Sequence, residues 1–461
     1  MSRRNKQMRQ VTEIEKQIRV RAEADVVVCG GGPAGIGAAL SAARNGAKTI
    51  LLEAHGFLGG MGTAGMVTSF AYGYHDKERF ITGGIFQEIR QKLHDRGGLI
   101  MTDRKGWEPF NAEQYKILAF ELLAEAGVEL LCHTTVVDTI TKAGTIEAII
   151  IESKAGREAL LATHVIDATG DGDVAERAGA LCKIGRDKDG GTQPSSLMYV
   201  LGNVDTEALG EKLDQEGRRG YWKTEDGYRY VNATGFADEI EQAKRDGFLT
   251  KVNRDHIAAI FTVPWVDNVV GINFGRIQGK NALDPQDLTD AEVIGREQVL
   301  DGIAFLKEYV PGFKRAELLQ TAPQVGIRET RRVIGDYVIT QEDIVELKQF
   351  DDCIAQSCYM IDIHSPDSST TEIYKLPKGT HYDIPYRALL PQGLNNLLVA
   401  GRCISATHEA LGSFRVQAIC LAIGEAAGAA AAIATKEKCL PREIDVTHLQ
   451  DTLVNQGAIL S

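Results

Sequence analysis

Residues 24–53 read ADVVVCGGGPAGIGAALSAARNGAKTILLE, and this stretch decides the fold. The β-branched run at 24–29 is typical of a buried parallel strand. The alanine-rich run at 36–45 predicts a helix, and Gly46 predicts its end. A second apolar run, at 49–52, predicts another strand. Strand, glycine turn, helix and strand make a βαβ unit, so we expect an α/β protein.

The turn between the first strand and the helix carries three spaced glycines. Gly30, Gly32 and Gly35 have G-x-G-x-x-G spacing, and Glu53 ends the second strand. The first glycine permits a tight turn, the second lets the backbone approach a pyrophosphate, and the third lets helix and strand pack closely. The helix N-terminus attracts the phosphates, and the acid accepts hydrogen bonds from ribose hydroxyls. The stretch therefore predicts a dinucleotide site.

Three further segments favour a flavin dinucleotide over NAD. A second glycine loop at 56–65 follows directly, and an NAD-only domain does not need it. A two-strand ladder precedes a strand at 162–168, which ends in ATGDGD. Near the C-terminus, an apolar strand at 396–400 is closed by Gly401.

Five segments together resemble the FAD-dependent oxidoreductase family, with a glutathione-reductase-type nucleotide domain and in its fumarate-reductase-like branch. They are GGGPAGIGAALSAARNGAKTILLE (30–53), GFLGGMGTAGMV (56–67), VIDATGDGDVAERAGA (165–180), GIRETRRVIGDYVIT (326–340) and the segment from YDIPYRALL to GEAAGAAAA (382–432). Related heterodisulfide-reductase-like proteins carry iron–sulfur clusters. This chain has no C-x-x-C, so we expect no cluster and no metal.

The resemblance implies FAD as the cofactor and a discontinuous Rossmann-type fold. We expect an α/β architecture, with a parallel sheet plus a β-meander and an inserted α+β substrate or capping domain. The FAD-binding domain would comprise 22–75, 115–185 and 388–461, the substrate domain 190–387, and a basic N-terminal arm 1–21.

The resemblance also implies which residues hold FAD. They are Gly30, Gly32, Pro33, Ala34, Gly35, Glu53, Ala54, Gly60, Met61, Thr63, Val136, Ala168, Thr169, Gly170, Gly401, Arg402, Gly412 and Ser413. Arg402 stands where disulfide reductases have an aspartate that contacts the ribityl chain.

The C-terminal segment predicts a long helix close to the flavin. Ser413 would be its N-cap, and the helix would run over 414–435 with its positive end towards the ring. Gly424 and Gly428 would let it pack closely on the sheet.

Two residues beside this helix are candidate catalytic groups. In fumarate-reductase-like enzymes a histidine and an arginine in this stretch hold the substrate near flavin N5. The resemblance therefore implies that His408 moves a proton and that Arg415 holds a substrate oxygen. The alternatives are a structural histidine and a buried salt bridge.

Two more clusters offer charged or titratable groups. In GIRETRR, a helix would place Arg328 beside Arg331 and Arg332, which suggests an anion site; pairing with Glu329 or other acids is the alternative. In MIDIHSPD, Asp362 and His364 form a second candidate acid–base pair, although a loop histidine is usually structural.

One more histidine, His75, follows the second glycine loop and could face the flavin ring.

Composition excludes several classes of partner. The chain has 51 Lys plus Arg against 63 Asp plus Glu, a net charge of −12, which argues against nucleic acid and anionic membranes. The apolar stretch at 418–434 is mostly alanine and predicts a buried helix. We expect a cytoplasmic protein, because the basic N-terminus lacks a following apolar run and the eight cysteines are scattered.

Together these features predict an FAD-dependent oxidoreductase that transfers a hydride between a small polar organic substrate, such as a hydroxy acid or a sugar, and flavin N5. Residues 190–387 hold no second strand followed by G-x-G-x-x-G, so an unidentified acceptor other than a built-in NAD(P) domain would take the electrons. An FAD monooxygenase, an NAD(P)H-linked C=C reductase and a non-catalytic flavin-binding protein stay open as alternatives. So does assembly into a homo-oligomer.

Overall fold

The computed structural model describes residues 11, 16–71, 80–101, 107–218, 220–224 and 227–460. His75 and most of the predicted basic arm lie outside the described residues.

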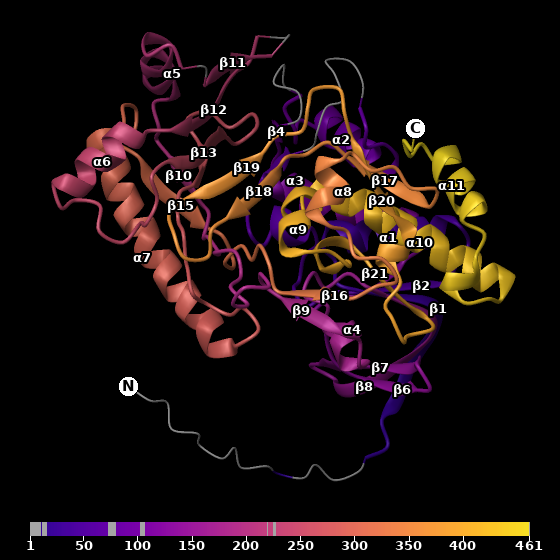
Figure 1. Ribbon diagram of the computed structural model, residues 1–461. Coiled ribbons are helices and arrows are strands. Elements are labelled where there is room, and N and C mark those ends of the chain that lie inside the picture. The colour runs from indigo at the N-terminus through magenta and orange to yellow at the C-terminus, as the bar shows by residue number, and fades with distance from the viewer. Residues whose placement is uncertain are drawn as a thin grey trace.

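The helices and strands follow one another as a mixed α/β chain (Figure 1). The helices are α1 Pro33–Arg44, α2 Gly84–Asp95, α3 Ala112–Glu125, α4 Asp173–Arg177, α5 Thr206–Gln215, α6 Ala237–Arg245, α7 Pro285–Tyr309, α8 Gln341–Val345, α9 His408–Phe414, α10 Gln417–Glu437 and α11 Val446–Asn455; the 3-10 turns are η1 Gly60–Gly62, η2 Tyr386–Leu389, η3 Gly401–Cys403 and η4 Pro441–Glu443. The strands are β1 Arg19–Cys29, β2 Thr49–Leu52, β3 Ser69–Ala71, β4 Trp107–Pro109, β5 Glu129–Leu131, β6 Thr135–Lys142, β7 Thr145–Ser153, β8 Gly156–Asp167, β9 Cys182–Ile184, β10 Tyr199–Gly202, β11 Tyr221–Lys223, β12 Arg229–Gly235, β13 Ile257–Thr262, β14 Val270–Asn273, β15 Glu317–Thr321, β16 Arg331–Val333, β17 Cys353–Ser357, β18 Ile361–His364, β19 Thr371–Tyr374, β20 Tyr382–Pro385 and β21 Leu397–Val399.

A largely parallel sheet forms the first layer. Strands β5, β2, β1 and β8 pair in that order, and β21 adds to β8 from the far end of the sequence. The amino-terminal half of β8 also pairs antiparallel with β7, which pairs with β6. Strand β8 therefore serves twice: its start pairs with β7 in the antiparallel ladder, and its end is the parallel strand that precedes ATGDGD. The predicted fold class, a parallel sheet with a β-meander, is confirmed.

Helices α1 and α10 pack against each other beside this sheet. A Cβ at Gly424 would lie 1.9 Å from the carbonyl oxygen of Ala34, and one at Gly428 would lie 2.2 Å from that of Ala38. The prediction that these glycines face the sheet is wrong. They let the backbone of α10 approach the backbone of α1, which starts at the dinucleotide turn.

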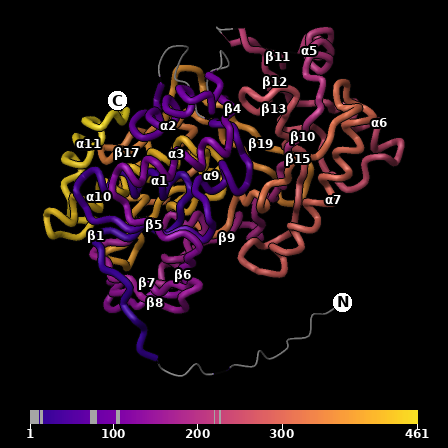
Figure 2. Tube along the Cα trace, turned by 180° about the vertical axis from the view of Figure 1, so that it is seen from behind, coloured from indigo at the N-terminus to yellow at the C-terminus, as the bar shows by residue number. Residues whose placement is uncertain are grey.

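A second, antiparallel sheet has the order β11-β12-β13-β14-β10-β15. It has its own apolar core, which includes Phe274 and Phe305. Figures 1 and 2 place it with α5, α6 and α7 on the opposite side of the molecule from α10 and α11. Its strands fall within the predicted substrate segment, but Ile339, Ile354 and Ile384 of the same segment pack into the first core. The domain boundaries stay a prediction.

The C-terminal helix differs from its prediction. Helix α9 begins at His408, with Thr407 as its N-cap, and α10 begins separately at Gln417. The N-cap residue of α10 is Val416, which makes no side-chain cap bond. The single helix predicted over 414–435 is therefore broken at Arg415, whose side chain turns towards β18.

Ser413 is not a helix cap. Its hydroxyl donates to the carbonyl oxygen of Tyr359 at 2.6 Å and accepts from the Tyr382 hydroxyl at 2.8 Å. Gly412 lies against Ile363 of β18. Both residues are buried between α9 and its neighbours, so local packing accounts for them.

The arginine-rich segment is not helical. Arg331 and Arg332 lie in β16, which pairs antiparallel with β9. Successive side chains of a strand point to opposite faces, so these two cannot share a face with each other. Long-range strand pairing replaces the helix that the three- and four-residue spacing predicted.

Helix α10 has the length and hydropathy of a membrane span, but 89 % of its most apolar window is buried inside the protein. This agrees with the expected buried helix.

Candidate functional site

The dinucleotide turn has the geometry that an extended phosphate-bearing ligand needs. Gly30 has a φ of +103°, and a Cβ there would lie 2.5 Å from the carbonyl oxygen of Ala168. In contrast, a Cβ at Gly32 would meet nothing nearer than the Cα of Gly60, at 3.8 Å. Helix α1 begins at Pro33, its N-cap Gly32 makes no side-chain cap bond, and Ala34 follows. The open backbone and uncapped helix end fit a pyrophosphate.

Glu53 is held in place beside this turn. One carboxylate oxygen, Oε2, accepts from the Gly31 N–H at 2.7 Å, and Oε1 accepts from the His55 N–H at 2.8 Å. The His55 Nδ1 also lies 2.8 Å from Oε1, and this contact raises the pKa of His55. A carboxylate oxygen can accept two bonds, so Oε2 has capacity for a ribose hydroxyl.

The residues around Glu53 complete this end of the site. The Thr134 N–H donates to the carbonyl oxygen of Glu53, which brings the start of β6 and Val136 beside it. Ala54 is exposed. The His55 Nε2 lies 3.0 Å from Oε1 of Gln324, which links the nucleotide turn to the segment after β15.

The second glycine loop lies against the first. A Cβ at Gly60 would lie 2.9 Å from the Cα of Gly32, and Met61 is half-buried. The Thr63 hydroxyl donates to the carbonyl oxygen of Leu58 at 2.6 Å. At the start of α10, Oε1 of Gln417 is buried and has no hydrogen-bond partner among the described residues.

Asp167, which sequence reasoning missed, organises the loop after β8. One oxygen accepts from the N–H and the hydroxyl of Thr169, at 3.1 and 2.7 Å. The other accepts from the N–H groups of Val174 and Ala175, both at 2.9 Å. This buried carboxylate fixes Ala168 and Thr169 and caps α4.

Arg402 bonds two other segments of the chain at the carboxyl ends of the parallel strands. Its Nε donates to the carbonyl oxygen of Gly170 at 2.8 Å, and its other nitrogens bond Ile327 and Asp171. Gly401 lies against Ala34 at the start of α1. Gly30, Ala168, Thr169, Gly170, Gly401 and Arg402 of the predicted FAD set thus lie at the carboxyl ends of β1, β8 and β21, where open parallel sheets bind ligands. Gly412 and Ser413 of the same set lie apart from them, in α9. The open glycine backbone and the unpartnered Gln417 oxygen fit FAD.

A second group of charged side chains gathers around Asp362. The Nη2 of Arg415 donates to the carbonyl oxygen of Asp362 at 2.9 Å and lies 3.6 Å from its carboxylate. The His364 Nε2 is 3.4 Å from the same carboxylate. Its Nδ1 is 3.4 Å from Nη1 of Arg276. We call Asp362, His364 and the four arginines 254, 276, 328 and 415 the arginine cluster.

Electrostatics in this cluster are strongly perturbed. Burial, and then the charge of Arg328, lower the pKa of His364 to about 3, so its ring is uncharged at neutral pH. Burial and the Arg415 charge lower the pKa of Arg328 to about 9. Burial and Arg276 lower the pKa of Arg254 to about 10. Burial also lowers the pKa of Arg276 and of Arg415. A guanidinium group nevertheless keeps its charge in proteins.

His408 lies apart from this cluster. Its Nδ1 bonds the buried carboxylate of Glu329, at 2.9 Å to Oε1 and 2.8 Å to Oε2. It lines a cavity of about 310 Å³ together with Ile361 and Ile363. Those isoleucines alternate along β18 with Asp362 and His364, so the cavity and the arginine cluster lie on opposite faces of the strand.

The three arginines of GIRETRR separate. Arg332 bonds Glu329 and the carbonyl oxygens of Ala406 and Gly185, and Arg331 pairs with Asp173. For Arg331 and Arg332 the alternative to an anion site, pairing with acidic residues, is therefore the observed arrangement. Arg328 instead donates to the carbonyl oxygen of Pro194 at 2.7 Å and joins the cluster. Arg254 and Arg276 were missed, because no local pattern marks them.

Comparisons with known proteins identify the family of the chain. A family model described as FAD dependent oxidoreductase matches residues 25–453. Thiamine thiazole synthase of Methanococcus maripaludis is 34 % identical over 158 residues, which are 32 % of this chain and 56 % of that protein. The enzyme of the same name from Methanococcus vannielii is 32 % identical over 160 residues, again 56 % of its length. The chain thus matches little more than half the length of these relatives.

Solved structures resemble the chain more distantly. A geranylgeranyl bacteriochlorophyll reductase-like protein of Thermoplasma acidophilum is 14 % identical with a TM-score of 0.47, covering 94 % of this chain and 83 % of that one. The p-nitrophenol 4-monooxygenase PnpA of Pseudomonas putida is 13 % identical with a TM-score of 0.45, covering 94 % and 84 %. Likenesses of this size carry no argument about the reaction.

Proposed function

Because the chain belongs to the FAD-dependent oxidoreductase family, we propose that it transfers a hydride between a small polar organic substrate and N5 of its FAD. Bound FAD supplies the two-electron chemistry, and the chain supplies position, charge and exclusion of water. The observation that carries the proposal is the convergence of Arg328, Arg415 and His364 around Asp362. Arg402 at the nucleotide edge bonds the carbonyl oxygen of Ile327, the residue before Arg328, so the cluster adjoins that edge. Perturbed titratable groups gathered beside a cofactor-binding edge are typical of an active site.

Four members of the cluster have distinct roles in this proposal. The guanidinium groups of Arg328 and Arg415 hold substrate oxygen atoms by charge-assisted hydrogen bonds. Asp362 orients Arg415 and His364. His364, uncharged at neutral pH, is a positioning residue, because one ring nitrogen lies near Asp362 and the other lies near Arg276 and Thr371. His408, which Glu329 holds on the other face of β18, has a structural role in this proposal.

The route of the electrons beyond the flavin is also part of the proposal. An electron acceptor outside the chain would take them, since residues 190–387 carry no second dinucleotide turn. The eight cysteines are all free among the described residues, which supports a reducing, cytoplasmic setting. Association into a homo-oligomer stays a proposal for solution measurement.

Anaerobic spectrophotometry tests the proposed function. The flavin-loaded protein is mixed without oxygen with hydroxy acids, amino acids and sugars, and separately with NADH and NADPH. We expect one organic class to bleach the flavin band and the nicotinamides to leave it unchanged. Bleaching by nicotinamides alone would indicate the monooxygenase or C=C reductase alternatives. No bleaching by any compound would contradict catalysis and leave a flavin-binding protein without turnover.

A further inference from the structure

One member of the arginine cluster presents a complete, buried and empty hydrogen-bonding edge. Arg254 is 1 % exposed, and its Nε and Nη2 have no hydrogen-bond partner among the described residues. Within the described part of the chain, Nη1 alone donates a hydrogen bond, to the carbonyl oxygen of Gly275 at 3.5 Å. Unpaired donors of a buried charged group cost free energy, and a bound ligand that accepts from them would remove this cost.

The same edge is filled in three other arginines of this protein. Arg90 uses Nε and Nη2 to hold both oxygens of Glu108, each at 2.6 Å. Arg387 holds Asp352 in the same way at 2.8 and 3.0 Å, and one carboxylate, that of Asp189, occupies this edge of Arg186. Nε and Nη2 form a fork that matches two oxygens of one oxyanion. Arg254 has the fork without the oxyanion.

The surrounding charges show how much negative charge the site can take. The cluster holds four guanidinium groups and one carboxylate, that of Asp362. Nε of Arg276 and Nη1 of Arg415 are also buried without partners. Asp255, the other acid that acts on Arg254, is exposed and bonded to His256. Positive charge therefore exceeds negative charge by more than one unit.

Hydrogen bonds from neighbouring side chains hold the backbone of Arg254 and of Arg276 in place. Gln298 of α7 accepts from the Arg276 N–H at 2.8 Å and donates to the Arg276 carbonyl oxygen at 2.8 Å. The Lys244 ammonium donates to the carbonyl oxygen of Arg254. Nη2 of Arg276 is fixed by the carbonyl oxygens of Ser365 and Thr370. Such support reduces the entropy lost on binding.

We propose that Arg254 and Arg276 form an acid-binding subsite, in which the free edge of Arg254 grips a carboxylate or phosphate of the substrate. The excess positive charge sets the class: the substrate carries at least two negative charges, as two carboxylates or as a phosphate. This deepens the proposed function and rests on it. Arg415 and Arg328 then face the reacting end of the same molecule, and Arg254 and Arg276 face its acidic end.

Anion binding to the flavin-loaded protein tests the subsite without turnover. Malonate, inorganic phosphate, acetate and uncharged malonamide are titrated by calorimetry into the wild-type protein. We expect malonate or phosphate to bind at least tenfold more tightly than acetate, and malonamide not to bind. The tighter of malonate and phosphate identifies the acidic group. Wild-type protein that binds neither malonate nor phosphate overturns the proposal.

Three variants of Arg254 separate the subsite from a structural role. Arg254→Gln and Arg254→Lys should each weaken anion binding at least tenfold, because the lysine ammonium keeps the charge and loses the fork. Arg254→Met should raise the melting temperature of the anion-free protein, since it removes a buried unpaired charge. Arg296→Gln, in an exposed pair with Glu292, is the charge-matched control and should bind anions as the wild type does.

The outcomes distinguish this proposal from the proposed function. Equal anion binding by wild type and all three variants would show an adventitious ion only and overturn the subsite. A fall in melting temperature for Arg254→Met, with anion binding retained, would also overturn it. Anion binding that depends on Arg254, together with a flavin that no organic substrate bleaches, would keep the subsite and overturn hydride transfer.

Discussion

The two faces of β18 hold two groups of buried charges that are balanced very differently. On one face Glu329 accepts from Arg332, from His408 and from the Gln193 N–H at 3.1 Å, and all of these side chains are at most 4 % exposed. On the other face, the carboxylate of Asp362 stands among four guanidinium groups with unfilled donors.

The difference separates a structural ion pair from a binding site. A buried pair whose members satisfy one another holds segments together, here β16, the segment around Gln193 and the start of α9. A buried cluster with excess charge and free donors is complete only with a ligand. Variants on the Glu329 face should therefore change stability, and variants on the Asp362 face should change turnover.

The largest expected effect is on the Glu329 face. Glu329→Gln leaves Arg332 buried without a counter-charge, so we expect the free energy of unfolding to fall by about 3–5 kcal/mol. Urea unfolding of the flavin-loaded protein, followed by far-UV circular dichroism, measures it. A loss below about 1 kcal/mol would show that Glu329 does not stabilise the fold through its buried contacts with Arg332 and His408.

The next effect concerns catalysis on the opposite face. Arg415→Gln removes a donor to the substrate while Asp362 keeps Arg328 and His364 as neighbours. We expect kcat/KM for flavin reduction to fall about 100-fold, as for loss of one oriented donor, with little change in stability. Stopped-flow reduction and urea unfolding of the same preparation measure both. A large stability loss with unchanged kcat/KM would reverse the roles of the two faces.

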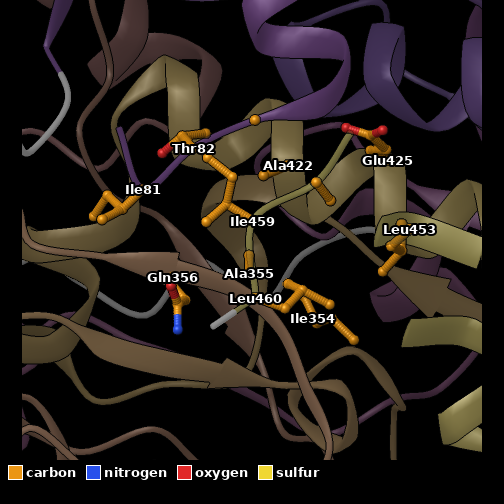
Figure 3. A pocket seen from close by; sticks show the side chains of 12 residues that line it. Ile81, Thr82, Ile354, Ala355, Gln356, Ala422, Glu425, Leu453, Ile459 and Leu460 are labelled. Carbon is orange, nitrogen blue, oxygen red and sulfur yellow. The ribbon is translucent and has the colours of Figure 1, made fainter. Parts of the chain in front are cut away.

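Glu425 is a third case, a buried acid with no cation bonded to it among the described residues. It lies on α10 beside Ala422 and Ile459 (Figure 3), and its Oε2 accepts from the Ile85 N–H at 3.0 Å. Burial outweighs that bond and raises the pKa of Glu425 from 4.5 to about 7. The folded state therefore binds this proton more tightly than the unfolded state, so stability falls as pH rises from about 4.5 to 7.

Glu425→Gln should remove this pH dependence. At pH 8 we expect the variant to be more stable than the wild type by about 2 kcal/mol, and the gain should vanish near pH 4. Thermal unfolding across this pH range measures the difference. A constant difference at all pH values would show that Glu425 titrates normally.

The smallest effect belongs to an exposed pair. Glu241 lies 2.7 Å from Arg245 on the surface of α6, and both side chains are more than half exposed. Glu241→Gln should change the free energy of unfolding by less than about 0.5 kcal/mol. It is the matched control for Glu329→Gln, and a change as large as that of Glu329→Gln would mean that burial does not set the cost.

Local sequence was enough to predict the glycine turn after β1 and the loop after β8. The turn at Gly30 and the loop at Ala168 depend on glycines and strands that are neighbours in sequence, so their spacing alone predicts their geometry. The parallel sheet followed for the same reason. The family resemblance then added the distant strand at β21, which joins β8 across more than half of the chain.

The placement of other residues depends on contacts between distant segments, which the local sequence does not predict. Pairing with β9 makes Arg331 and Arg332 part of a strand, and contacts with Tyr359 and Tyr382 make Ser413 a packing residue. Arg254 and Arg276 come from two different connections of the second sheet, and only the fold brings them within reach of the Asp362 charge. A charged residue in a loop gives no local sign that it will be buried.

The most direct measurement compares flavin reduction by an acidic substrate and by its uncharged amide, under anaerobic stopped-flow conditions. The account predicts that the acid reduces the flavin at least 100-fold faster per unit concentration, and that Arg254→Gln removes most of this preference. Equal rates for acid and amide in the wild-type protein would contradict it.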